Sequence, residues 1–321
     1  MKKYLFVPVL FFCVNVFFSQ ITFPTNGAPN NNHNTYAFKN CMLHVDYQTV
    51  LTNGVLLMRD GIILDAGEKI SIPSDAIVYD LKGKHIYPAF IDVYADYGMP
   101  EVKLPSKPAF TPLMESSIKG PYNWNMAVRP ETDAVKLFSH DQKNAEEWRK
   151  LGFGFLLTSQ KDGIVRGSAA LVALNNTREN ESIVKDKAAA LYSFRKGLSP
   201  QDNPEALAGS IALLRQTYLD AQWYSNKNNK AEYNISLEAF NQLQSLPQIF
   251  ETNDKLSGLR ADKIGDEFGV KYIIKGSGNE YQRMNEIQAS SCKFILPINF
   301  PEAFDVEDPF EAEQVTLTDL K

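Results

Sequence analysis

The stretch that most constrains the fold is residues 83–98, GKHIYPAFIDVYADYG, in which an apolar run changes abruptly into polar residues. The run is rich in β-branched and aromatic side chains and is bracketed by glycines, so it predicts one buried strand. Asp92, Tyr94 and Asp96 alternate along this strand and are therefore expected to point to one side of it. Polar side chains at the carboxyl end of a buried parallel strand are typical of (β/α) barrels, which build their sites there.

The last third of the chain alternates between short β-rich runs and helical patterns. Strands are expected at 248–251, 270–275 and 293–297, and helices at 255–268 and 280–289. This alternation predicts βαβ units and a parallel sheet. Earlier in the chain we expect strands at 152–159, 169–174 and 188–194, and helices at 142–150, 203–228 and 236–245. Counted from Ile86, the sequence predicts about seven strands, one fewer than a closed barrel has.

The fold class predicted is α/β, with a small β-sandwich over residues 36–84 and a partial (β/α) barrel of the TIM type over residues 85–321. In the first segment, the tripeptides TNG at 52–54 and RDG at 59–61 favour hairpin turns. In the second, residues 99–129 contain five prolines and few apolar repeats. A connection of this length inside a compact domain is usually a lid or an insertion. Residues 160–167, QKDGIVRG, are expected to form turns.

The N-terminus has the pattern of a secretory signal peptide. Two lysines follow the initiator methionine, an almost unbroken apolar run covers residues 4–18, and the composition turns polar after Gln20. The run is too short for a membrane span, so we expect residues 1–20 to be removed and the chain to be periplasmic or secreted. Cys13 would permit a lipid anchor, but the bulky residue before it does not suit that processing.

The mature chain is expected to begin with an extended lead-in over residues 21–35, which is rich in proline, asparagine and glycine. Only Cys41 and Cys292 remain after cleavage; cysteines so far apart are more often free thiols than a bridge, although an oxidising compartment permits a disulfide. The 321 residues are 44% hydrophobic and 22% charged, which is ordinary for a globular chain with a core. A net charge of −5 gives no basic stripe, so nucleic acid is not an expected partner.

Residues 83–96 resemble the first barrel strand of the amidohydrolase superfamily, in particular its imidazolonepropionase-like branch, whose pattern is GK-x-x-x-P-G-F-I-D-x-H-x-H. The frame of this pattern is matched by Gly83, Lys84, Pro88, Phe90, Ile91 and Asp92. Ala89 replaces a glycine, and Tyr94 and Asp96 replace the two metal-binding histidines. Residues 53–67, NGVLLMRDGIILDAG, are similar to the β-domain that precedes the barrel in that family. The resemblance implies the family's first barrel strand with its two metal-binding histidines replaced.

The resemblance continues at residues 249–276, which are similar to the fifth and sixth barrel strands and the helix between them. In the family, a histidine near the end of each of these strands completes the metal site. Here Glu251 takes the fifth-strand position, and Lys275 or Gly276 the sixth. The family's eighth-strand aspartate would lie beyond Lys321. The resemblance therefore implies the degenerate N-terminal copy of a secreted bacterial protein with two amidohydrolase-like halves.

The residues themselves give little support to a zinc site, which needs several neutral imidazoles together with carboxylates. The four histidines lack the family spacing and are expected to be structural or solvated: His33, His44, His85 and His140. Carboxylates leave one alternative open, because Asp92, Asp96 and Glu251 could converge and bind Mg²⁺ or Ca²⁺ through oxygen ligands, with Lys275 beside them. No nucleophile elbow and no phosphate-binding glycine motif is present, so no catalytic residue and no nucleotide cofactor is predicted.

Two functions remain open from the sequence. The first is part of a metal-dependent hydrolase that acts on non-peptide C–N bonds of a small molecule, with the zinc-like metal of a complete family member supplied by a C-terminal catalytic half of the same polypeptide. The second is a non-catalytic binding or scaffold module paired with such a half. A downstream H-x-H strand would favour the first function. Low metal content with retained binding to the partner half would favour the second.

Overall fold

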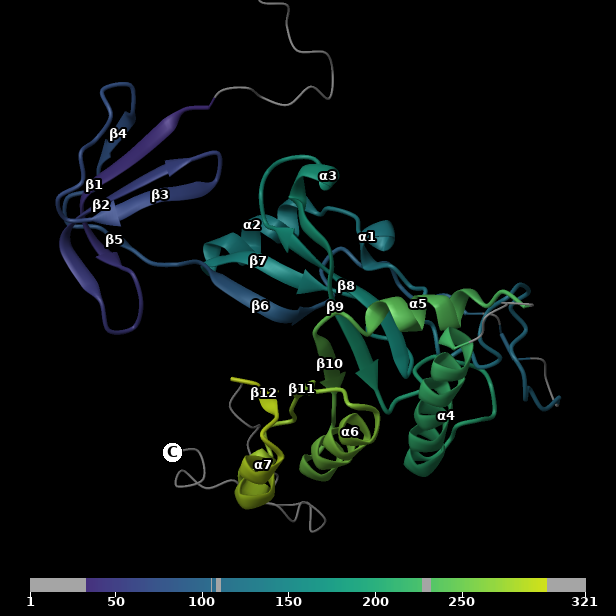
Figure 1. Ribbon diagram of the computed structural model, residues 1–321. Helices are drawn as coiled ribbons and strands as arrows, with labels where there is room; N and C mark the ends of the chain where they lie inside the picture. The colour runs from purple at the N-terminus through teal and green to yellow at the C-terminus, as the bar shows by residue number, and fades with distance from the viewer. Residues whose placement is uncertain (1–32, 105, 108–110, 227–231, 299–321) are drawn as a thin grey trace, which may run out of the picture. The chain divides into compact units, whose positions relative to one another are not determined.

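The computed structural model describes residues 33–104, 106–107, 111–226 and 232–298 (Figure 1). The chain divides into two compact units, Met1–Pro88 and Ala89–Lys321, each with its own sheet. The α/β fold class expected from the sequence is confirmed. None of the described helices combines the length and the apolar character that crossing a membrane requires.

The first unit is one sheet with the strand order β3-β2-β1-β4, in which β5 also pairs with β1. Its strands are β1 (Thr35–His44), β2 (Val50–Arg59), β3 (Ile62–Gly67), β4 (Ile77–Asp80) and β5 (His85–Ile86). The hairpin expected at residues 59–61 is present, with Asp60 and Gly61 both at positive φ between β2 and β3. The turn expected at 52–54 is wrong, because these residues lie inside β2. Gly54 there packs against Leu43, where a Cβ atom would not fit.

The second unit contains a seven-stranded sheet whose strands follow one another in sequence order. They are β6 (Phe90–Ala95), β7 (Phe153–Thr158), β8 (Val165–Ala173), β9 (Ile183–Ser193), β10 (Gln248–Glu251), β11 (Tyr272–Lys275) and β12 (Lys293–Ile295). The parallel arrangement predicted for the last third is confirmed from β9 to β12. In contrast, β8 runs antiparallel to both of its neighbours, β7 and β9.

The sheet of the second unit curls around a shared apolar cluster. All seven strands contribute a side chain to it: Ala169, Ala189, Leu191 and Ile249 at its centre, with Tyr94, Leu157, Ile273 and Ile295 packed against them. Lys275 of β11 reaches over the Tyr94 ring of β6, 5.6 Å from its centroid, although four strands lie between them, so the sheet curves as the wall of a barrel does. Within the described residues, β6 and β12 each pair with a neighbour on one side only. The incomplete barrel expected from the sequence is therefore what these strands form.

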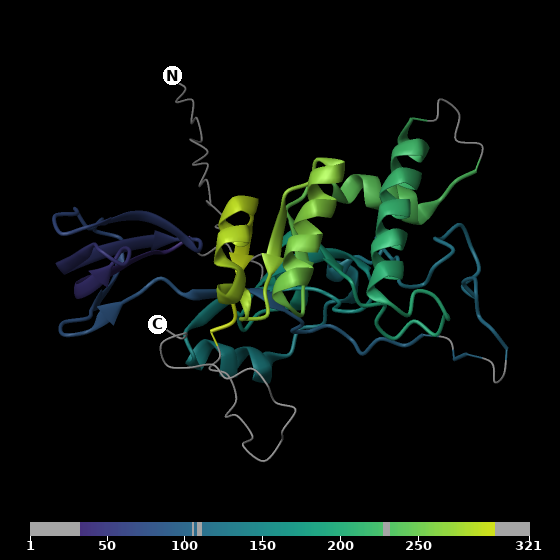
Figure 2. The same ribbon diagram turned by 90° about the horizontal axis from the view of Figure 1, so that it is seen from below.

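Helices cover the outer face of this sheet. They are α1 (Ala134–Leu137), α2 (Gln142–Lys150), α3 (Glu179–Ser182), α4 (Leu207–Ser225), α5 (Ile235–Leu243), α6 (Lys255–Phe268), the 3-10 helix η1 (Glu280–Arg283) and α7 (Met284–Ser290). Figures 1 and 2 show α4, α6 and α7 standing side by side along one face. The largest core cluster lies beneath α4, α5 and α6 and includes Tyr218, Phe240 and Tyr272. Because helices cover the outer face of the sheet, a site is expected at the ends of its strands.

The single buried strand predicted over residues 83–98 is wrong. Pro88 has no N–H to donate to a ladder, and the chain leaves one sheet and enters the other around it. His85 and Ile86 pair with β1, whereas β6 begins at Phe90 and pairs with β7. Phe90 and Ile91 are 63% and 54% exposed, because β6 lies at the edge of its sheet in the described part of the chain.

Two further expectations concern irregular segments. The long connection at residues 99–129 carries no helix or ladder strand among its described residues, as expected. The turn predicted at 160–167 is too long, because β8 already begins at Val165. Cys41 is buried within the first unit, and Cys292 is half-buried within the second. The signal peptide and residues 21–32 of the lead-in lie outside the described residues, and Thr35 already belongs to β1.

Candidate functional site

Strand direction decides which residues meet at the mouth of the partial barrel. β6, β10 and β11 are parallel to one another, so their carboxyl ends lie at the same end of the barrel. These ends carry Tyr94, Glu251 and Lys275. β8 runs in the opposite direction, so its first residues lie at this same end of the barrel. Arg166, the second residue of β8, therefore lies beside the ends of strands that are distant in sequence.

A β-bulge turns Arg166 toward the barrel interior. Ala169 belongs to the inner cluster, whereas Ala170 and Val172 pack on the outer face, so strict alternation along β8 would also place Arg166 outside. The register between β8 and β9 shifts between Val165 and Gly167, and Gly167 takes φ +84°. A bulge with a left-handed glycine moves the strand by one residue and redirects the side chain next to it.

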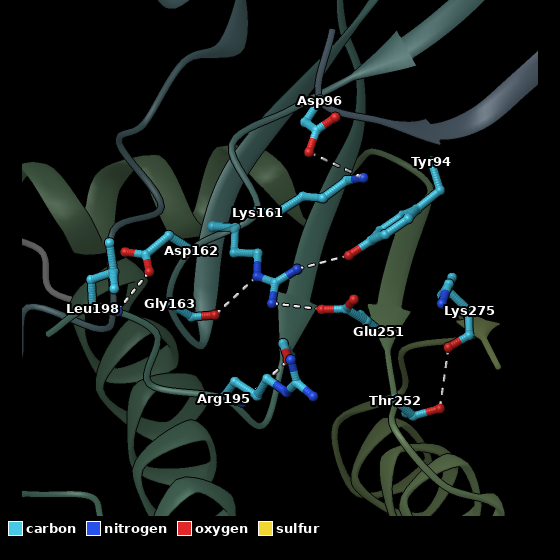
Figure 3. Close-up of polar contacts among 12 residues, drawn as sticks. Tyr94, Asp96, Lys161, Asp162, Gly163, Arg195, Leu198, Glu251, Thr252 and Lys275 are labelled. Carbon is cyan, nitrogen blue, oxygen red and sulfur yellow. Dashed lines mark hydrogen bonds and ion pairs between the residues drawn. The ribbon is translucent and has the colours of Figure 1, made fainter. Parts of the chain in front are cut away.

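The centre of the site is the Arg166 guanidinium, each of whose nitrogens has a partner. Figure 3 labels the three partners, Tyr94, Gly163 and Glu251. Nη2 forms an ion pair with the Glu251 carboxylate at 2.7 Å, Nη1 donates to the Tyr94 hydroxyl at 2.8 Å, and Nε donates to the Gly163 carbonyl at 3.0 Å. The Arg166 and Glu251 side chains are only 2% and 18% exposed. A buried ion pair is tolerated when hydrogen bonds satisfy both partners, and this network meets that condition for the cation.

Two lysines lie over the Tyr94 ring. The Lys161 Nζ atom is 4.5 Å from the ring centroid and the Lys275 Nζ atom is 5.6 Å from it, both within the range of cation–π attraction. Lys161 also approaches Asp96, with 3.6 Å between Nζ and Oδ2. The Asp96 side chain is 70% exposed, so this pair contributes little to stability.

The electrostatic surroundings keep Glu251 charged and Tyr94 neutral. Burial by itself would raise the pKa of Glu251, but the charge of Arg166, hydrogen bonds from Arg166 and Tyr94, and the charge of Lys275 outweigh it and leave this pKa below its usual value. Burial raises the pKa of the Tyr94 hydroxyl above its usual value. Tyr94 therefore stays protonated, and the network holds one carboxylate against one guanidinium.

A cavity of about 690 Å³ opens beside this network. Its walls come from the Arg166 and Glu251 side chains, from Gln160 and Lys161 after β7, from Arg195 after β9, and from residues 99–102 of the long connection. A concave site of this volume at the carboxyl ends of barrel strands is the usual location for a small ligand.

The four positions that the resemblance marks as substituted metal ligands are Tyr94, Asp96, Glu251 and Lys275. The structure brings Tyr94 and Glu251 onto Arg166 and places Lys275 over the Tyr94 ring. It leaves Asp96 at the rim on Lys161. Tyr94, Asp96 and Glu251 each lie beside a cationic side chain, and Lys275 is itself a cation.

These residues do not fit a divalent metal ion. Among the residues described, no cluster of three or more His, Cys, Asp or Glu side chains could hold one. Asp92, the third carboxylate considered for Mg²⁺ or Ca²⁺, accepts a hydrogen bond from the Tyr94 backbone N–H at 2.9 Å. The guanidinium of Arg166 occupies the space between the remaining oxygen donors, Tyr94 and Glu251, so a cation there would meet like charge.

The histidines lie elsewhere. In the first unit, His33 pairs with Asp60 at 2.9 Å, and His44 and His85 are hydrogen-bonded to each other at 2.9 Å. In the second unit, His140 Nδ1 lies 3.1 Å from the Tyr97 hydroxyl, outside the cavity lining.

Sequence reasoning missed Arg166, because residues 160–167 were expected to form turns. One sequence feature could have identified it: VRGSAALVA is an apolar run with a single charge near its start. A charge inside a buried run requires a partner, so the run itself indicates a second, acidic position that must converge on it. Arg195 and Gln160 follow strands and carry no comparable pattern.

The curled sheet, with helices outside and a site at the strand ends, is a fold that this chain shares with a solved amidohydrolase structure. The chain is similar to the crystal structure of an amidohydrolase from Thermotoga maritima, with a TM-score of 0.63 and 20% identity over 82% of this chain and 70% of that one. A further amidohydrolase structure (TM-score 0.36, 12% identity, 82% of this chain and 77% of that one) and a Xaa-Pro dipeptidase (0.38, 12%, 81% and 66%) are too distant to add to this. No protein-family model matches the sequence. No curated protein matches it either.

Proposed function

We propose that this chain is a small-molecule binding module of the amidohydrolase type, without a metal centre of its own, that acts beside a metal-bearing half. In this proposal the metal-bearing half hydrolyses C–N bonds other than peptide bonds. The observation that carries the proposal is the guanidinium of Arg166, held by Tyr94 and Glu251 at the strand ends. The amidohydrolase fold supports the reaction class.

An arginine at this place changes the chemistry available. The guanidinium keeps its charge at every physiological pH and has no lone pair to give to a metal or to a proton. It neutralises Glu251 directly, so this carboxylate is not free to act as a general base. Such a network favours holding and orienting a ligand over activating water.

The same proposal includes a partner for the open sheet. β6 exposes Phe90, Ile91 and Val93, and within the described residues neither β6 nor β12 has a second neighbour. Unpaired backbone and apolar side chains at a sheet edge favour pairing with another strand. We propose that the occupant is a strand of a downstream, complete amidohydrolase-like half of the same polypeptide, to which this chain is the degenerate N-terminal copy, and that the whole is exported.

Metal analysis tests the central claim. The purified chain is incubated with Zn²⁺, desalted and analysed by mass spectrometry of the metal, beside a Glu251→Gln variant. We expect both proteins to retain far less than one zinc per chain. Stoichiometric zinc in the wild type that is lost in Glu251→Gln would show a metal centre at this site and overturn the proposal.

The partner is tested by the size of the native gene product, detected in periplasmic extracts with an antibody against this segment. We expect a band much larger than 36.1 kDa. A band slightly below that mass would contradict a covalently linked half. The binding role would then need a separate partner chain to cover β6.

A further inference from the structure

A group of polar side chains in the first unit takes no part in the cavity. The Nε2 atom of His44 lies 2.9 Å from the Nδ1 atom of His85, and the Tyr87 hydroxyl lies 3.5 Å from that same Nδ1 atom. Two nitrogen donors and one oxygen donor therefore converge at one place on this sheet. Imidazole nitrogens together with oxygen donors are a common ligand set for transition metals.

Strand pairing explains why these side chains meet. β5 pairs in parallel with β1, and His85 lies opposite Met42. The same register, continued by two residues, sets Tyr87 beside His44. Because side chains alternate along an extended chain, His85 and Tyr87 point to the same face. The Tyr87 ring stacks on the His44 ring, with 4.0 Å between the centroids and 14° between the planes, in agreement with this register.

All three donors are accessible to a solute. Tyr87 is 62% exposed, His85 is exposed and His44 is half-buried. Among the described residues, the two imidazole rings form no hydrogen bond outside this group. Water can replace the hydrogen bond between the two rings, so exchanging it for bonds to a metal costs little.

We propose that His44, His85 and Tyr87 form a binding site for Cu²⁺. The nitrogen–nitrogen separation of 2.9 Å matches adjacent corners of a square-planar site whose metal–imidazole bonds are about 2.0–2.1 Å. Square-planar and tetragonal sets of nitrogen and oxygen donors are characteristic of Cu²⁺, which also ranks highest among the divalent ions in its affinity for such donors. Water completes the coordination.

Each imidazole binds in its neutral form. The exposed rings rotate so that both lone pairs point at the metal, and the ring whose N–H bridges the pair carries its proton on its other nitrogen instead. The Tyr87 hydroxyl transfers its proton to water and binds as a phenolate. One Cu²⁺ is therefore taken up and one proton is released.

This site is separate from the metal centre that the proposed function denies to the barrel, and the inference goes beyond that function. All three donors belong to the first unit, whereas Glu251 belongs to the second. Because imidazole and oxygen donors bind Cu²⁺ more tightly than Zn²⁺, the zinc analysis above remains a test of the strand ends. The two proposals therefore fail or succeed independently.

Titration calorimetry of the native protein with copper(II) sulfate, in a buffer that does not bind copper, tests the site. His44→Gln and His85→Gln should each reduce the affinity at least about tenfold, because even losing a residue that only supports a metal ligand costs about 10–100-fold. The matched control is His33→Gln, which removes another exposed histidine of this unit, paired with Asp60 at 2.9 Å, and should leave the affinity unchanged. Equal affinities of the wild type and both variants at positions 44 and 85 would overturn the proposal.

Electron paramagnetic resonance of the copper-loaded protein identifies the ligands. We expect hyperfine coupling to two imidazole nitrogens in the wild type and to one in either His44→Gln or His85→Gln. Tyr87→Phe should keep both nitrogens and the ring stack but lose the phenolate-to-copper absorption in the visible range. A wild-type spectrum without coupling to two nitrogens, or unchanged absorption in Tyr87→Phe, would contradict the assignment.

Discussion

At the scale of single residues, the stability of the site depends on keeping Arg166 and Glu251 together. Replacing Arg166 by methionine leaves the Glu251 carboxylate buried without its cation. We expect Arg166→Met to reduce the free energy of unfolding by about 3–5 kcal/mol, the usual cost of breaking a buried pair. Urea denaturation followed by fluorescence measures this loss.

The matched control for that variant is Arg215→Met. Arg215 also forms an ion pair with two hydrogen bonds, to Glu267 at 2.6 and 2.8 Å. The side chains of both partners are well exposed to water. Water solvates the carboxylate that this substitution leaves behind, so the midpoint of denaturation should change little. If both variants lose the same stability, burial is not what makes the Arg166 pair important.

The lowered pKa of Glu251 predicts how stability depends on pH. A carboxyl group whose pKa is lower in the folded state stabilises the fold above its unfolded pKa of about 4.3, and this contribution is lost as the pH falls through the folded-state value. The difference in unfolding free energy between wild type and Glu251→Gln should therefore be largest near neutral pH and shrink below about pH 4. Denaturation curves of both proteins across pH 3–7 measure it, and a pH-independent difference would contradict the assignment.

At the scale of elements, the bulge in β8 predicts an unequal pair of glycine substitutions. Gly167 and Gly269 both have positive φ, at +84° and +71°. A Cβ atom at Gly167 would overlap the backbone oxygen of Thr132, whereas one at Gly269 would meet nothing within 4 Å. Gly269→Ala should cost about 1–2 kcal/mol, the left-handed penalty alone. Gly167→Ala should cost clearly more, because the added methyl group also overlaps the Thr132 backbone.

Thermal denaturation of the two alanine variants checks this order. Each is compared with wild type at the same protein concentration. Equal melting temperatures would show that the chain near Thr132 yields to the added methyl group. The bulge would then not be what holds Arg166 in place.

The helices and strands were predictable where local chemistry marks their ends. Helices α2 and α6 have the predicted bounds, since Asp141 and Asp254 accept from the first free N–H groups and Gly269 ends α6 in the left-handed conformation. Strand direction was not predictable, because whether β8 runs with or against β7 depends on pairing between distant segments. Tyr94 and Glu251 were therefore expected at the mouth, whereas Arg166 was not.

At the scale of the whole molecule, the N-terminal twenty residues predict export. If residues 1–20 are a signal peptide, the mature chain should begin near residue 20 or 21. N-terminal sequencing of the native protein from the periplasm or the medium checks this. A cytoplasmic protein that retains its first twenty residues would contradict it, and would make a disulfide between Cys41 and Cys292 chemically unsupported as well.

The reversal of β8 also affects how this chain responds to mutation. In a strictly parallel barrel, the residues that open each strand lie on the floor, where substitutions are tested only for packing. Here Arg166, the second residue of its strand, borders the cavity. A substitution near the start of this one strand therefore alters the wall of the cavity as well as the packing around it.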